Sequence, residues 1–309
     1  MGSLMFDLIQ GDARDLDIES ESVDCVITSP PYYGLRNYFD NDQIGNEHTP
    51  EGYILNLISA FREVWRVLKP GGTAWLNLGD TYAPGSIDVG GFDVQRKDLI
   101  GIPWRVAFSL QADGWILRQD IVWHKPNPTP ESARDRCTRA HEFLFLLVKG
   151  CDYYFDADAI RTPYVRDWGQ SNGSVGKSGY QENTTQTGGA PVSRGPTKKG
   201  ANKRSVWSIS AEPYKGAHFA VMPPGLVEPC ILAGCPAGGV VLDPFAGSGT
   251  VGSVAIKHGR EFIGVDLNRE FLALASERLT RALSDAGRAH PGVKTGSGSV
   301  QFGLFAKEE

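Results

Sequence analysis

Apolar and polar positions alternate along this chain in blocks of two kinds. Short apolar runs recur, and amphipathic stretches with helical spacing separate them. The apolar runs are Leu8–Ile9, Val23–Ile27, Thr73–Leu78, Ile116–Trp123, Phe143–Val148, Val240–Leu242 and Phe262–Val265. Such alternation is typical of a mostly parallel sheet with helices on both faces. The pattern therefore predicts an α/β fold with a doubly wound sheet.

The clearest helix is predicted from Pro50 to Lys69. Its apolar residues recur three and four positions apart and form one stripe. Thr49 is the expected N-cap, Pro50 stands in the first turn, and Pro70-Gly71-Gly72 is the expected stop. We expect this helix to be scaffold, with its stripe facing the core.

The alternation breaks in the middle of the chain, between about 161 and 205. Gly, Ser, Thr, Asn, Gln and Lys dominate there, and an irregular insert of this length in a compact domain is usually functional or disordered. Five basic residues near its end are candidate contacts to nucleic-acid phosphates: Arg194, Lys198, Lys199, Lys203 and Arg204. A solvated linker that carries lysines is the alternative.

Composition narrows the class of protein. The formal net charge of −5 argues against a wholly nonspecific nucleic-acid binder. We find neither a membrane-spanning apolar run nor a secretory signal, and therefore expect a cytoplasmic protein without a membrane partner. The five cysteines form no CxxC pair, which favours buried thiols and predicts no metal site.

The first candidate for chemistry is a glycine turn that follows the strand Val240–Leu242. Gly247, Gly249 and Gly252 have GxGxxG spacing, and Asp266 follows the next strand at about the distance of a ribose-binding acid. A nicotinamide dinucleotide is one reading. However, Asp243 at the strand end would repel a pyrophosphate, whereas it would attract the ammonium group of a cationic sulfonium cofactor. The alternative is a tight strand-to-helix turn that binds no ligand.

The second candidate is Thr28-Ser29-Pro30-Pro31-Tyr32, directly after the strand Val23–Ile27. Two prolines stop the strand and fix the backbone carbonyls, which then have no ladder partner. Hydrogen bonds from an amino group to Ser29 and to the Pro30 carbonyl would favour a pyramidal nitrogen, and Tyr32 could stack on a flipped base. A Pro-Pro turn on the surface is the alternative.

Together, these two motifs resemble those of the DNA amino-methyltransferases. Ser29 to Tyr32 matches the family's [DNS]-P-P-[YFW] catalytic motif, and Phe245 to Gly249 matches its FxGxG cofactor motif. With the catalytic motif early and the cofactor motif late, the chain resembles the permuted β group. The resemblance implies a Rossmann-like class I methyltransferase fold with an antiparallel strand in the sheet, S-adenosyl-L-methionine as cofactor, and Ser29, Pro30, Pro31 and Tyr32 as catalytic residues.

The resemblance also implies a set of cofactor contacts. Asp243 to Thr250 would cradle the methionine part, Asp266 would bind the ribose, and Asp12 would accept from the adenine amino group. The segment Leu76 to Asp80 would line the target pocket, or else be an ordinary strand end. The predicted cofactor-binding residues are Asp12, Ala13, Thr28, Phe219, Asp243, Phe245, Ala246, Gly247, Gly249, Thr250 and Asp266.

The same resemblance divides the chain into three parts. Residues 1–162 and 206–284 would form one catalytic domain, 163–205 an inserted target-recognition region, and 285–309 a mobile tail. In that tail Gln301 to Phe305 resembles the short peptides that dock on bacterial sliding clamps, although such a cluster more often packs back on its own domain. The implied partners are double-stranded DNA, a cognate restriction endonuclease and this clamp.

Several functions remain open. Serine at the first motif position favours the N4 nitrogen of cytosine, with the N6 nitrogen of adenine as the alternative. A cytosine-C5 enzyme would need Pro229-Cys230 as nucleophile, but that pair precedes the cofactor motif. Protein-glutamine methyltransferases share an N-P-P-Y motif but carry their cofactor motif first. A DNA-binding relative without turnover is the non-catalytic reading.

Overall fold

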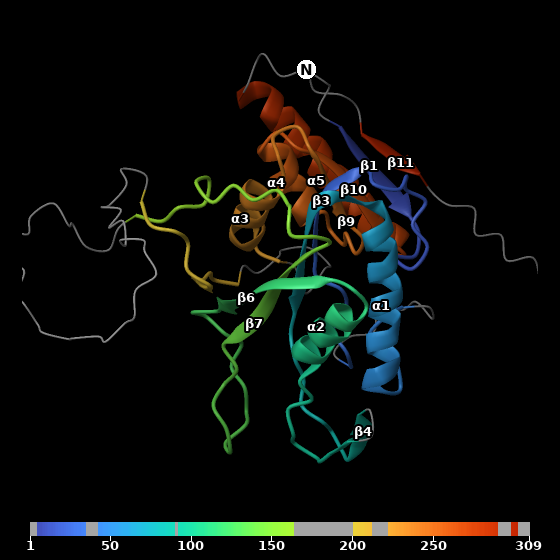
Figure 1. The fold of residues 1–309 in the computed structure, drawn as a ribbon, viewed down its shortest axis with the longest axis vertical. Coiled ribbons are helices and arrows are strands. Elements are labelled where there is room, and N and C mark those ends of the chain that lie inside the picture. Colours follow the sequence, from blue (N-terminus) through green and yellow to red (C-terminus); the bar gives the residue numbers. More distant parts are fainter. Residues whose placement is uncertain are drawn as a thin grey trace, which may run out of the picture.

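One mostly parallel sheet organises the molecule. The computed structural model describes residues 5–34, 43–89, 92–163, 200–211, 222–289 and 298–301. Within these ranges nine strands form a sheet in the order β11-β1-β10-β9-β2-β3-β7-β6-β8 (Figure 1). They are β1 (Phe6–Gln10), β2 (Val23–Thr28), β3 (Leu68–Leu78), β6 (Ile116–His124), β7 (His141–Val148), β8 (Val206–Ser208), β9 (Val240–Asp243), β10 (Glu261–Asp266) and β11 (Ser299–Gln301).

The strand β7 runs opposite to the rest of the sheet. It pairs antiparallel with β3 on one side and with β6 on the other, whereas the other neighbouring strands of the sheet pair in parallel. The predicted α/β class, the mostly parallel sheet and its antiparallel strand are confirmed. A separate two-stranded hairpin, β4 (Ile87–Val89) with β5 (Phe92–Val94), follows β3 in the chain.

Helices cover both faces of this sheet, as the alternation predicts. The helices are α1 (Pro50–Val67), α2 (Ile102–Ala112), α3 (Pro224–Gly234), α4 (Thr250–Lys257) and α5 (Arg269–Ala289). Successive residues of a strand point to opposite faces. Accordingly, Val26 of β2 packs with α1 and α2, while Ile27 packs with α3, α4 and α5. No helix in the described ranges is long and apolar enough to cross a membrane.

The helix α1 agrees with its prediction at the start and differs at the end. The Thr49 side chain caps it by accepting from Gly52 N at 3.1 Å. The helix ends at Val67, and the predicted stop Pro70-Gly71-Gly72 instead lies in the first half of β3. The strand therefore begins five residues before the apolar run that starts at 73. These first residues, 68–72, are partly exposed.

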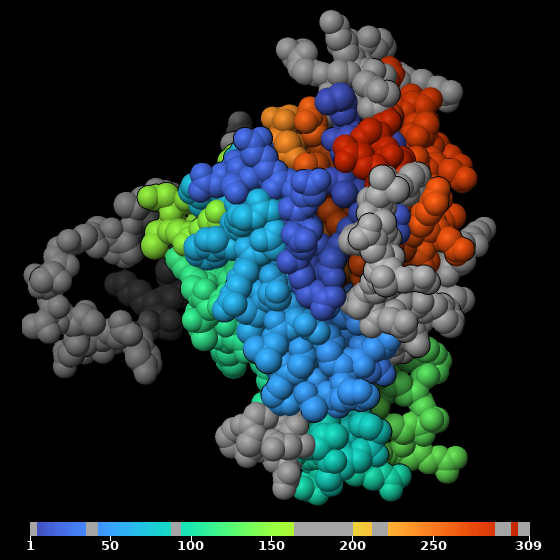
Figure 2. All heavy atoms as spheres, turned by 90° about the vertical axis from the view of Figure 1, so that its right-hand side faces the viewer, coloured from blue at the N-terminus to red at the C-terminus, as the bar shows by residue number. Residues whose placement is uncertain are grey.

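The C-terminal segment contains more regular structure than the predicted mobile tail. The helix α5 continues to Ala289, past the expected boundary at 284, and β11 pairs in parallel with β1. In Figure 2 the red surface of β11 accordingly lies beside the blue surface of the N-terminal residues. Gln301 ends β11, and the rest of the predicted clamp peptide lies outside the described residues.

The chain segments at the two ends of the predicted insert lie side by side. Thr162 and Ala201 exchange two backbone hydrogen bonds of 2.9 Å each. Soon afterwards β8 joins the sheet beside β6. The chain therefore leaves and returns at nearly the same point, and residues 164–199 between these points lie outside the described ranges.

A glycine of α4 sets how closely this helix packs. A Cβ atom on Gly252 would lie 2.4 Å from Phe262 Cδ1 and 2.7 Å from Leu279 Cδ2, both buried side chains. We therefore expect Gly252→Ala to lower the free energy of unfolding by about 1–3 kcal/mol through overpacking, measured by urea denaturation. Gly225→Ala is the matched control in α3, because its nearest contact would be an ordinary 3.5 Å; equal stability of both variants would contradict the prediction.

Candidate functional site

The site lies where the winding of the sheet changes direction. From β9 the chain crosses through α4 to β10, which lies on one side of the central pair β9 and β2. From β2 it crosses through α1 to β3, which lies on the other side of that pair. Since β9 and β2 are parallel neighbours, their carboxyl ends open a crevice at this switch point, the usual ligand site of such sheets.

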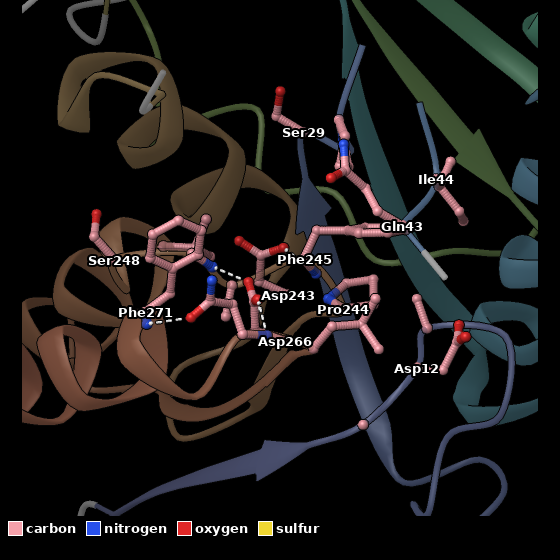
Figure 3. A pocket seen from close by; sticks show the side chains of 18 of the residues that line it. Asp12, Ser29, Gln43, Ile44, Asp243, Pro244, Phe245, Ser248, Asp266 and Phe271 are labelled. Carbon is pink, nitrogen blue, oxygen red and sulfur yellow. Dashed lines mark hydrogen bonds between the residues drawn. The ribbon is translucent and has the colours of Figure 1, made fainter. Parts of the chain in front are cut away.

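The crevice contains a cavity of about 930 Å³, part of which is open to solvent (Figure 3). The ends of β9 and β10, the segments that follow β1, β2, β9 and β10, and the residue Met222 before α3 form its wall. The lining residues are Gly11, Asp12, Ala13, Ser29, Pro31, Gln43, Ile44, Met222, Asp243, Pro244, Phe245, Ala246, Gly247, Ser248, Thr250, Val251, Asp266, Leu267, Asn268 and Phe271. Both motifs singled out in the sequence therefore meet in one cavity.

Asp243 is the buried acid of this cavity. Its Oδ1 accepts from Thr28 Oγ1 at 2.7 Å and from Phe245 N at 3.1 Å. Burial raises the pKa of Asp243 to about 7, against these two hydrogen bonds, which lower it. A cation in the cavity would favour the ionised carboxylate. Thr28, which we predicted as a cofactor contact, does not line the cavity, because its buried hydroxyl is directed at Asp243.

Asp266 supports the glycine turn from the neighbouring strand end. Its carboxylate accepts from Gly247 N at 2.8 Å and from Asn268 N at 2.9 Å (Figure 3). Gly249 begins α4 with a left-handed φ of 74°, and it does not line the cavity. Thr250 lines the cavity and accepts from Arg278 of α5 at 2.8 Å.

The turn after β1 supplies a third acid to the wall. Asp12 and Ala13 line the cavity, and Figure 3 shows Asp12 on the side away from Ser248 and Phe271. Asp12 accepts from the Arg14 backbone at 2.8 Å and pairs with the Arg14 guanidinium at 2.6 Å. This ion pair holds the Asp12 carboxylate in one orientation at the cavity.

The proline motif lies across from Asp243. Ser29 and Pro31 line the cavity, whereas Pro30 is buried beneath it. The Pro31 carbonyl accepts from the Tyr53 hydroxyl at 2.9 Å, and among the described residues none donates to the Pro30 carbonyl. The Pro30 carbonyl, which we predicted as an amino-group acceptor, therefore has no protein donor in the described part of the chain.

Tyr32 does not line the cavity. Its hydroxyl lies within hydrogen-bonding distance of Asn77 and Glu142. Of the predicted pocket segment 76–80, Asn77 therefore reaches the motif. Asp80 instead accepts from the backbone of Gly101 and Ile102 at the start of α2, at 2.9 Å each, which is a structural role.

The predicted DNA contacts are only partly described. Arg194, Lys198 and Lys199 lie outside the described residues, and so does Phe219, which we predicted as a cofactor contact. Lys203 and Arg204 precede β8, which β3, β7 and β6 separate from β2. Lys203 Nζ lies 4.7 Å above the Trp207 ring, and burial lowers the pKa of this lysine. These two residues are therefore not part of the cavity.

Several lining residues were not predicted from the sequence. The sequence could have indicated Asn268, because asparagine is a preferred N-cap and this one follows the strand end at Asp266. It caps α5 by accepting from Glu270 N at 2.8 Å. Phe271 follows within the first turn of that helix. Gln43 and Ile44 are buried in the wall although no pattern around them indicates a site.

Comparisons with known proteins identify relatives along nearly the whole chain. A family model described as DNA methylase, of the N6/N4 class, matches residues 23–277. The chain is 44% identical over 293 residues to the Type II methyltransferase M.SmaI of Serratia marcescens, covering 89% of this chain and 90% of the relative. It is 42% identical over 291 residues to M.Cfr9I of Citrobacter freundii, covering 88% and 87%.

Solved structures share the fold. The PvuII DNA methyltransferase, described as cytosine-N4-specific, superimposes with a TM-score of 0.63 at 19% identity, covering 94% of both chains. The complex of M1.HpyAVI with SAM gives a TM-score of 0.55 at 18% identity, covering 89% of this chain and 99% of that one. At these identities the likeness concerns the fold.

The buried acid gives a test that needs no ligand. The folded protein holds Asp243 with a pKa of about 7, far above the ordinary value of 3.8, so stability should fall as the pH rises between these values. Asp243→Asn retains Oδ1 as acceptor but does not titrate. In urea unfolding the variant should differ little from the parent at pH 4.5 and be more stable by up to about 4 kcal/mol at pH 8.

The control for this experiment is Asp152→Asn, at an exposed position. Its difference from the parent should stay near zero across the same pH range. A difference between Asp243→Asn and the parent that did not change with pH would contradict the assignment of the raised pKa.

Proposed function

Because the chain belongs to the N6/N4 family of DNA methylases, it is a DNA methyltransferase, and we propose that it methylates the N4 nitrogen of cytosine at a specific site in double-stranded DNA. S-adenosyl-L-methionine is the methyl donor. The observation that carries the proposal is the meeting of Ser29 and Asp243 in one cavity, from strand ends that Thr28 joins.

The cavity fits this cofactor by the chemistry of its wall. S-adenosylmethionine supplies an electrophilic methyl group on a sulfonium centre. Its ammonium group would restore the charge of Asp243, whose burial otherwise disfavours ionisation. Asp266 would accept from the ribose hydroxyls and Asp12 from the adenine amino group, because carboxylate oxygens are hydrogen-bond acceptors. Ile44, Phe245 and Phe271 are among the apolar side chains of the wall that could contact the adenine ring.

Ser29 and the Pro30 carbonyl would bind the target amino group. The lone pair of such a nitrogen is delocalised into the base, and two hydrogen bonds from its protons to these oxygens favour the pyramidal form that can attack the methyl group. The rigid Pro30-Pro31 backbone holds both acceptors in place, and positioning of this kind supplies much of the rate. As the N–C bond forms, the bond between the methyl group and the sulfonium sulfur would break, and the methylated nitrogen would lose one proton to solvent or a nearby group.

The choice of cytosine rests on the serine. Ser29 stands where the family's adenine enzymes usually have aspartate or asparagine, so adenine N6 is the alternative. Cysteine-based C5 methylation has no support from Cys230, which is buried in α3 and hydrogen-bonded to Leu226 O at 3.2 Å. Burial raises the pKa of this thiol, which disfavours the nucleophilic thiolate.

Target recognition is proposed for the insert 163–205, with Arg194, Lys198, Lys199, Lys203 and Arg204 facing phosphates. The return of the chain at Thr162 and Ala201 supports an insert that varies independently of the catalytic domain. The Type II relatives also support a cognate restriction endonuclease as a partner.

Ser29→Ala tests the role of the motif. We expect the rate of tritiated methyl transfer to DNA to fall about 100-fold or more, because a positioned polar group is lost. Cofactor affinity, measured by calorimetry, should change less than about twofold, since Asp243 and Asp266 are untouched. Ser22→Ala, in a turn before β2, is the control and should retain activity. Full activity of Ser29→Ala would overturn the assignment.

The methylated base is identified by mass spectrometry of nucleosides from DNA treated with the purified enzyme. We expect N4-methylcytosine, and it should form about 100-fold more slowly, or more slowly still, with Ser29→Ala. N6-methyladenine as the product would keep the methyltransferase assignment and reverse the choice of base.

A further inference from the structure

The Tyr32 hydroxyl lies at the centre of a polar cluster that the motif alone does not explain. It is 2.7 Å from Glu142 Oε2, 3.0 Å from Asn77 Oδ1 and 3.3 Å from Ser29 Oγ. These groups come from the start of β7, from β3 and from the end of β2. Three neighbouring strands therefore converge on one hydroxyl beside the cavity.

The direction of these hydrogen bonds can be assigned. Burial and the Glu142 carboxylate raise the pKa of Tyr32 well above its ordinary value, so the hydroxyl stays protonated and donates. A hydroxyl has one proton, and the Glu142 carboxylate oxygen at 2.7 Å is a closer acceptor than the amide oxygen of Asn77 at 3.0 Å. Ser29 can then donate to the Tyr32 oxygen.

Glu142 is itself held in place. Its other oxygen, Oε1, pairs with Lys125 Nζ, and that ammonium lies 4.4 Å above the Trp123 ring. Trp123 is buried and directly opposite Glu142 in the β6–β7 ladder. The two carboxylate oxygens thus have separate partners: Oε1 pairs with Lys125, and Oε2 accepts from Tyr32.

The ring of Tyr32 is fixed on its side as well as at its hydroxyl. A Cβ atom on Gly79 would lie 2.6 Å from Tyr32 Cε2, so the ring packs directly against the backbone after β3. The backbone beside Tyr32 is held by the hydrogen bond from Tyr53 to Pro31. Once the Glu142 bond forms, the ring has little freedom to rotate away.

We propose that Glu142 is a positioning residue for methyl transfer: by accepting from the Tyr32 hydroxyl it fixes the Tyr32 ring and, through it, the Ser29 hydroxyl at the place of the target amino group. This inference rests on the proposed function and adds to it a residue on β7, 110 positions from the motif. Glu142 does not itself line the cofactor cavity.

A double-mutant cycle separates positioning through Tyr32 from a general structural role. The variants are Tyr32→Phe, Glu142→Gln and the two combined. The measurements are the single-turnover rate of methyl transfer at saturating DNA and cofactor, and the affinity for each. We expect each single substitution to slow transfer by about 10–100-fold, the effect of losing a charge-assisted hydrogen bond, with cofactor affinity unchanged within about twofold.

The combined variant decides the question. If Glu142 acts through the Tyr32 hydroxyl, Glu142→Gln adds no further loss in the Tyr32→Phe background. If the two losses multiply, or if cofactor affinity falls with the rate, the proposal is overturned. Glu142→Asp provides a second variant that retains the charge beside Lys125 but draws the carboxylate back from Tyr32. It should slow the parent enzyme and leave the Tyr32→Phe variant unaffected.

A matched control is Glu228→Gln. Like Glu142, Glu228 has two side-chain partners, here Lys257 and His258, but it lies on α3 away from the cavity wall. The rate of the Glu228→Gln variant should therefore stay within about twofold of the parent. If the parent enzyme transfers methyl groups to DNA but the rate losses of the two single variants multiply in the combined variant, only the proposed role of Glu142 is rejected. A parent enzyme that transfers no methyl group to DNA would reject the proposed function and this role with it.

Discussion

The hydrogen bond from Thr28 to Asp243 joins two strand ends that are 215 positions apart in the sequence. It exists because β2 and β9 are parallel neighbours at the point where the sheet changes its direction of winding. One strand end leads into the proline motif and the other into the glycine turn. Their order along the chain is therefore irrelevant to the site, since the sheet brings the same two ends together whichever comes first.

Acidic side chains set the electrostatic character of the cavity. Asp12, Asp243 and Asp266 all line it, and each is oriented by hydrogen bonds from its own surroundings. Three carboxylates would repel a pyrophosphate, whereas a ligand with a sulfonium and an ammonium group is attracted. The raised pKa of Asp243 shows the cost of burying this carboxylate without a cation.

The sequence could predict the parts of the site that lie within one strand and its following turn. Ser29 and Asp243 were found in this way, because each follows an apolar run directly. The partner of Tyr32 could not be found, since Glu142 reaches it only through the register in which Leu78 of β3 pairs with Phe143 of β7. Local patterns do not encode such a register. The end of α1 was misjudged for a related reason, because pairing with β2 draws Leu68 into β3 despite the following proline.

The hydrogen bonds around Tyr32 also bear on why the motif begins with serine. The carboxylate of Glu142 already lies at this end of the sheet and is connected to Ser29 through a single tyrosine hydroxyl. An aspartate at position 29 would bring a second carboxylate into the same hydrogen-bond network, and two carboxylates that share a network favour protonation of one of them. A neutral hydroxyl avoids this conflict and still offers an acceptor to an amino group. In this chain, the serine is thus matched to the acid on β7, which gives the choice of residue a physical reason independent of family tendency.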